Sequence, residues 1–119
     1  MAFKHAVSVI WEGIKEFFQS VVNIVRKVIR GVLNFVKEVV NYFKKLALDP
    51  RKDTPFLIDS EVLKEKIKNA PRVNVGIFEG VYDEDTNEIT NVRQVEADAL
   101  DEQTQDVLSK ADEGIVALS

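Results

Sequence analysis

Residues 3–48, FKHAVSVIWEGIKEFFQSVVNIVRKVIRGVLNFVKEVVNYFKKLAL, carry the pattern that decides the expected fold of this chain of 119 residues. On a helical wheel at about 100° per residue, their large apolar side chains fill one side over an arc of roughly 180°. The apolar stripe of an ordinary surface helix covers roughly 100°. Gly31 is the central candidate for a break, but the stripe keeps its phase through it. The pattern therefore predicts one continuous or gently bent amphipathic helix, rather than two helices folded against each other.

The middle of this apolar face is the predicted interface. It consists of Ile14, Phe17, Phe18, Val21, Val25, Val28, Val32, Phe35, Val39 and Phe43. One border of the face has small residues, which let another helix approach closely. They are Gly13, Ser20 and Gly31. The other border has basic residues whose long stems cover apolar surface while their charges reach water. They are Lys15, Arg26 and Lys44.

After residue 48 the pattern changes to that of a small acidic α+β domain. Prolines bound a polar linker at 49–55, since the residue before a proline is disfavoured in a helix. Alternating apolar residues predict strands, with a β-bulge near Asn91, and aspartates predict the starts of two short helices. The strands are expected near 56–58, 73–82, 88–97 and 115–118, and the helices near 60–69 and 101–110.

The expected fold class is therefore α+β. A long N-terminal amphipathic helix (1–48) and the linker (49–55) precede a mixed domain (56–119). We expect that domain to contain about two short helices and a three- to four-stranded, largely antiparallel sheet.

Charge is distributed unevenly along the chain. Residues 1–48 have eight basic and three acidic side chains, a net charge of +5, whereas residues 49–119 have a net charge of −9. This asymmetry favours docking of the two parts on each other, although an acidic surface also simply keeps a domain in solution. A signal peptide is not expected, because Glu12 breaks the apolar run after Lys4 and no small-residue cleavage site follows. A transmembrane helix is not expected either, because basic residues interrupt every apolar window near 20 residues. The cytoplasm or a membrane surface is the expected location.

Motifs for catalysis or metal binding are weak. Asp83-x-Asp85-x-Asn87 begins like a calcium loop, because alternating oxygen ligands converge on one hard cation. The match then fails at Glu88, where the loop needs glycine, and at Gln94, where it needs glutamate. We expect a solvated turn there, with no bound metal and no cofactor.

Other chemistries lack their sequence signals. The chain has no cysteine, hence no disulfide, thiol nucleophile or thiolate metal site. It has no glycine-rich phosphate loop, nucleophile elbow or zinc pattern, and enzymatic activity is not expected. Arg26, Lys27 and Arg30 form only a small basic cluster, diluted by neighbouring residues, so nucleic acid is not an expected partner either.

The expected function follows from the apolar face, which a soluble protein cannot leave in water. The first interpretation is a non-enzymatic interaction protein whose helix mediates self-assembly or docks on a partner helix. The second is attachment to an anionic membrane surface, with Trp11, Phe17, Phe18 and Phe35 inserted among the lipid headgroups. The third is a membrane-permeabilising helix restrained by the acidic domain.

Overall fold

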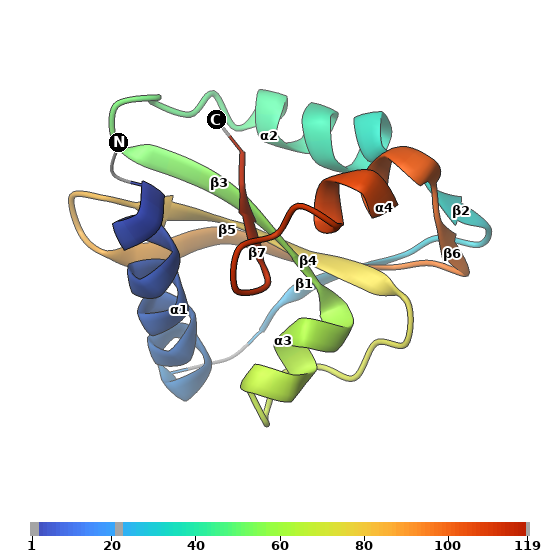
Figure 1. Ribbon diagram of the computed structural model, residues 1–119, viewed down its shortest axis with the longest axis horizontal. Helices are drawn as coiled ribbons and strands as arrows, with labels where there is room; N and C mark the ends of the chain where they lie inside the picture. The colour runs from blue at the N-terminus through green and yellow to red at the C-terminus, as the bar shows by residue number, and fades with distance from the viewer. Residues whose placement is uncertain (1–2, 21–22, 119) are drawn as a thin grey trace.

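A five-stranded sheet with helices on both faces forms the centre of the protein (Figure 1). The computed structural model describes the backbone of residues 3–20 and 23–118, and the side chains of 7–20 and 23–118. The helical elements are α1 (Phe3–Ser20), the π-helix η1 (Val36–Val40), α2 (Asn41–Lys45), α3 (Ser60–Lys66) and α4 (Glu102–Leu108). The strands are β1 (Val25–Val28), β2 (Val32–Leu33), β3 (Asp53–Asp59), β4 (Gly76–Asp83), β5 (Glu88–Glu96), β6 (Ala99–Leu100) and β7 (Ile115–Ala117).

The strand order in the large sheet is β1-β5-β4-β3-β7. Every pairing is antiparallel except that of β1, which runs parallel to β5. A separate two-stranded sheet pairs β2 with β6. The expected α+β class with a largely antiparallel sheet is confirmed, and a fifth strand is added because β1 comes from a region that the sequence predicted to be helical.

The predicted continuous helix over 3–48 is wrong in its extent. The helix α1 ends at Ser20, and two strands, a turn at Gly31 and the short helices η1 and α2 follow it. The linker expected at 49–55 is shorter, because β3 already begins at Asp53. The helix hairpin at Gly31 is not formed either, since strands flank that glycine on both sides.

The reason is tertiary packing. Valines are frequent in the first 48 residues, and β-branched side chains are favoured in strands and disfavoured in helices. A straight helix would also leave its apolar half-cylinder in water in a single chain. By folding back, the chain instead places Leu33, Phe35 and Val39 on the sheet, where all three are buried.

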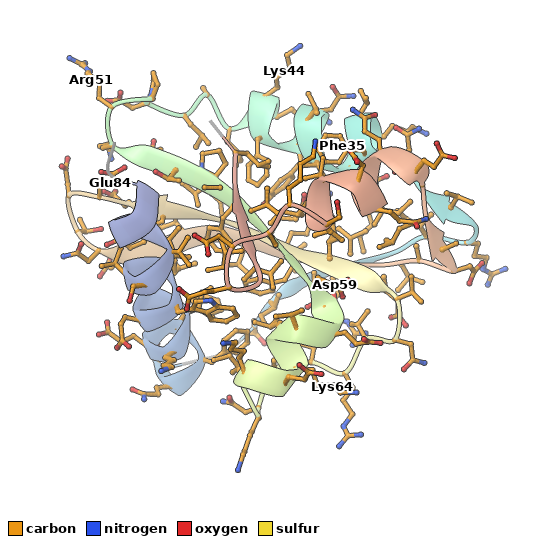
Figure 2. The ribbon with its side chains drawn as sticks, viewed as in Figure 1. Phe35, Lys44, Arg51, Asp59, Lys64 and Glu84 are labelled. Atoms are coloured by element: carbon orange, nitrogen blue, oxygen red, sulfur yellow. The ribbon has the colours of Figure 1, made fainter. Side chains whose placement is uncertain are left out.

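Two apolar cores lie on the two faces of the large sheet, with α1 and α3 on one side and α2 and α4 on the other (Figure 1). The first core joins α1 to Phe56 and Phe78 of the sheet, through Ile10 and Ile14. The second core contains Leu33, Phe35, Val39, Leu57, Ile77, Val95 and Ala97. The amino-terminal segment therefore contributes to both cores, and Figure 2 shows Phe35 directed into the protein while Lys44 extends away from it.

Several local predictions are confirmed. The register of β4 against β5 shifts between Glu79 and Val81, so that Asn91 and Val92 lie opposite Gly80 in a β-bulge. Asn91 has a φ of 52°, as the extra residue of such a bulge often has. Two aspartates cap helices as expected: Asp59 accepts from the amide of Glu61 at 2.9 Å, and Asp101 from that of Thr104 at 2.8 Å.

Candidate interaction surface

The strand β1 forms one edge of the large sheet. Within the described part of the chain it pairs only with β5, and all four of its residues are exposed. Val25 is 64% exposed and Val28 is 67% exposed. Exposed apolar residues on an open sheet edge are unusual, because such an edge is a template for pairing with another chain. We call the outer side of Val25–Val28 the docking edge.

The backbone of the docking edge has hydrogen-bonding groups that face outward. Ile29 donates its amide to the carbonyl of Glu96 at 2.7 Å, which fixes the register of the parallel ladder. In a parallel pair, alternate residues direct both backbone groups to the same neighbour. The N–H and C=O groups of Arg26 and Val28 therefore point away from β5, toward any strand that adds beside β1.

A turn at Gly31 makes β1 end where it does. Gly31 has a φ of 114°, which other L-residues rarely adopt. Its amide donates to the carboxylate of Asp98 at 2.8 Å, and its carbonyl accepts from the amide of Asp98 at 2.9 Å. The chain then continues into β2, which pairs with β6 just after Asp98.

Replacing Gly31 with alanine should lower the free energy of unfolding by about 1–2 kcal/mol. Apart from Gly31 and its two chain neighbours, no heavy atom of the described residues lies within 4 Å of the position of a Cβ here, so the cost is backbone strain and not a clash. Urea unfolding followed by circular dichroism measures it. The neighbouring exposed Val32→Ala is the control, expected within about 0.5 kcal/mol of wild type. Equal losses in the two variants would contradict strain at Gly31.

A cluster of charged side chains behind β1 joins it to the middle of the sheet. We call Lys27, Glu38, Glu79 and Arg93 the Arg93 cluster. Arg93 Nη2 lies 2.8 Å from Glu79 Oε2, and Arg93 Nε donates to the same oxygen at 2.9 Å. Lys27 Nζ lies 2.9 Å from Glu38 Oε1, and Arg93 Nη2 lies 3.5 Å from that oxygen. The cluster thus connects β1, β5, β4 and η1.

Arg93 also explains the π-helical geometry of η1. Its Nη2 donates to the backbone carbonyl of Glu38 at 2.6 Å. A side chain that donates into the hydrogen-bond ladder of a helix can disrupt it locally. In η1 the amide of Asn41 donates to the carbonyl of Val36, five residues back. Arg93 thereby fixes η1 on the sheet, and Tyr42 covers the guanidinium, 4.1 Å from the ring centroid.

Glu79 lies in an unusual environment for a carboxylate. Its side chain is fully buried, and Oε1 has no hydrogen-bond partner among the described residues. Burial raises the pKa of Glu79 to about 7, although Arg93 acts to lower it. Burial, and the negative charge of Glu79 after it, also raises the pKa of Tyr42, whose hydroxyl donates to the carbonyl of Asn91 at 2.7 Å.

The sequence-predicted interface is divided among three environments. Ile14 is buried in the first core, and Phe17 and Phe18 pack against that core. Phe35 and Val39 are buried in the second core, with Phe43 packed against it. Val25, Val28 and Val32 are exposed. Val21 lies outside the described residues. The ten residues therefore do not form one face, because the predicted helix is not continuous.

The two predicted borders are divided as well. Gly13 lies against the side chain of Ile89 inside the protein, Ser20 donates to the carbonyl of Glu16 at the end of α1, and Gly31 forms the turn after β1. The basic residues lie on three different elements. Lys15 is near Glu12 on α1 at 3.7 Å, Arg26 is on β1, and Lys44 extends from α2 (Figure 2).

The turn at Asp83, Asp85 and Asn87 uses its oxygens internally. The carboxylate of Asp83 accepts from Lys52 Nζ at 3.1 Å and from the amide of Asp85 at 2.9 Å, and the hydrogen bond from Lys52 lowers its pKa. The side-chain oxygen of Asn87 accepts from the hydroxyl of Tyr82 at 2.6 Å. Within the described ranges, no group of three or more histidine, aspartate or glutamate residues is arranged to hold a metal ion.

Sequence reasoning missed the Arg93 cluster. A signal for it was present, because Glu79 interrupts an otherwise apolar stretch from Ile77 to Val81. A charged residue in the middle of a buried strand needs a partner. The identity of that partner could not be predicted, because Arg93 is fourteen residues away and Glu38 lies in a segment predicted to be helical.

Comparisons of the chain with protein-family models, with curated proteins and with solved structures found no match. Of the helices in the described residues, none has the length and apolar character needed to cross a membrane.

Proposed function

We propose that this chain is a non-enzymatic interaction protein that binds an extended segment of a partner protein as an additional strand beside β1. The observation that carries the proposal is the docking edge, with its outward backbone groups and its two exposed valines. Addition of a strand to an open sheet edge is a recurring mode of peptide recognition, in which the main chain supplies affinity and side chains supply specificity.

Two further observations support this function. The charged groups of the Arg93 cluster are engaged with one another, and Glu79 is fully buried, which suits a structural role better than contact with a substrate. Trp11 and Phe35, which supported attachment to a membrane surface, are both only 7% exposed. The apolar residues that do reach solvent on β1 are valines, which suit a sheet edge.

Replacing Val28 with proline is the direct test. The amide of Val28 points outward, so the substitution removes a bond to an added strand and none to β5, and proline is tolerated in this way on edge strands. Peptides selected on the wild-type protein from a random phage-displayed library should bind the V28P variant at least about tenfold more weakly. Affinities are measured by fluorescence anisotropy of labelled peptides.

Val28→Ala is the matched control, because it shortens the same side chain but keeps the amide. We expect it to retain most of the affinity. Selected peptides that bind V28P as well as wild type would contradict strand addition, as would a selection that enriches no peptide. Light scattering provides a further check: a stable dimer that V28P dissociates would place a second copy at the docking edge instead of a different partner.

A further inference from the structure

Basic side chains lie on both faces of the docking edge. Arg26 and Lys27 are consecutive, so they project to opposite faces of the sheet. Arg26 forms an ion pair with Glu96 Oε1 at 3.2 Å, and Lys27 forms one with Glu38 Oε1 at 2.9 Å. Both basic side chains remain about half exposed. Side chains of an added strand would lie about 5 Å away, where opposite charges stabilise the pair and like charges destabilise it.

A second copy of this chain fits the docking edge poorly. Two copies of β1 paired antiparallel would place Arg26 or Lys27 of one copy opposite the same basic pair of the other. The opposite edge of the sheet, β7, has the sequence Ile-Val-Ala and offers no acidic residue. The charges of β1 therefore favour a strand from a different protein.

A pocket of about 330 Å³ lies beside the start of β1. Its walls come from the end of α1, from the start of β1 and from the segment after α3, with Phe17, Phe18, Ile24, Arg26, Asn69 and Pro71 among the lining residues. The two phenylalanine rings contact edge to face at 5.3 Å, and the amide of Asn69 donates to the carbonyl of Phe18 at 2.9 Å. Asn23 lines the pocket as well, so its walls combine two phenylalanine rings and the side chain of Ile24 with two asparagines and a guanidinium.

We infer that the segment bound beside β1 is acidic and carries a large apolar side chain that enters this pocket; the inference rests on the strand addition proposed above. Carboxylates of the segment lie opposite Arg26 and Lys27. The apolar side chain lies on the face of Ile24 and Arg26, since these two residues line the pocket from β1 and the residue before it. Aromatic and apolar side chains beside a few polar groups are typical of binding pockets.

Synthetic peptides test this inference without changing the protein. The probe is an eight-residue peptide with valines, two consecutive central glutamates and one phenylalanine near its end. One matched control replaces both glutamates with lysine, and a second replaces the phenylalanine with alanine. We expect the lysine peptide to bind about tenfold or more weakly than the glutamate peptide, and the alanine peptide severalfold more weakly. The preference for glutamate should also decrease at high salt and in the Arg26→Gln variant.

The outcomes separate this inference from the proposed function. Equal affinities of the glutamate and lysine peptides, lost together in V28P, would overturn the acidic partner and leave strand addition standing. A glutamate preference with no effect of the phenylalanine would remove the pocket from the inference. Binding that V28P does not weaken, or no binding of any peptide at roughly 1 mM, would overturn strand addition itself and the inference with it.

Discussion

Replacing Arg93 with alanine is expected to lower the free energy of unfolding by about 3–5 kcal/mol at pH 8. Arg93 is the only arginine or lysine within 4 Å of Glu79 among the described residues, and Glu79 is fully buried. Removing the guanidinium leaves either a buried ionised carboxylate or one that must take up a proton from a basic solution. The variant also loses the bond to the carbonyl of Glu38 and the packing on Tyr42. At pH 5, where Glu79 is protonated, the loss should be smaller.

Urea unfolding at the two pH values measures these losses. Arg26→Ala is the matched control, since it removes an arginine from the neighbouring strand and breaks an ion pair of 3.2 Å with Glu96. Both partners of that pair are substantially exposed, so its loss should cost less than about 1 kcal/mol at either pH. Similar losses for the two arginine variants would contradict a structural role for the Arg93 cluster.

The second part of the chain was predictable because its signals are local. Aspartate caps, a bulge residue with positive φ and alternating apolar residues act over a few positions, and the elements they predicted after residue 53 are all present. The structure of the first part could not be predicted in this way, because residues 25–33 have both the apolar period of a helix and the β-branched composition of a strand. The choice between them depends on β5, about seventy residues away, which offers β1 a place in the sheet.

The same contrast between local and long-range signals applies to the candidate interaction surface. The sequence placed Val25, Val28 and Arg26 on or beside an interaction surface, and the structure leaves these three side chains exposed. It placed Phe35 and Val39 on that surface as well, and they are buried instead. Hydrophobicity alone indicates that a side chain is buried in the functional protein. Whether that side chain is buried by this chain or by a partner depends on long-range strand pairing, which the pattern of a single sequence does not specify.

Ion pairs link the Arg93 cluster to the docking edge. β1 is short and exposed, and among the described residues it pairs on one side only. Lys27 ties it to Glu38, and Arg93 ties Glu38 to Glu79 in the centre of the sheet. A change in the ionisation of Glu79 therefore acts on the element that holds the docking edge in place.

Replacing Glu79 with glutamine should remove a pH dependence of stability between about pH 4.5 and 7. The pKa of Glu79 in the folded protein is about 7, raised from the value of 4.5 that is typical of an unfolded chain. Between these values the folded protein keeps a proton that the unfolded chain has released. Stability from this group is thus present at low pH and is lost as the pH rises toward 7. The raised pKa corresponds to a loss on the order of 3 kcal/mol when Glu79 is fully ionised.

Glutamine keeps the shape of the side chain and an oxygen for Arg93, but it cannot ionise. We therefore expect the Glu79→Gln variant to be close to wild type at pH 5 and more stable than wild type at pH 8, by about 1–3 kcal/mol. The difference between the two urea curves isolates Glu79 and its interactions, because ionisable groups that do not interact with Glu79 contribute equally to both. Exposed Glu88→Gln is the control and should run parallel to wild type. If the Glu79→Gln curve also runs parallel to wild type from pH 5 to 8, Glu79 is ionised throughout, and Arg93 compensates its charge fully despite burial.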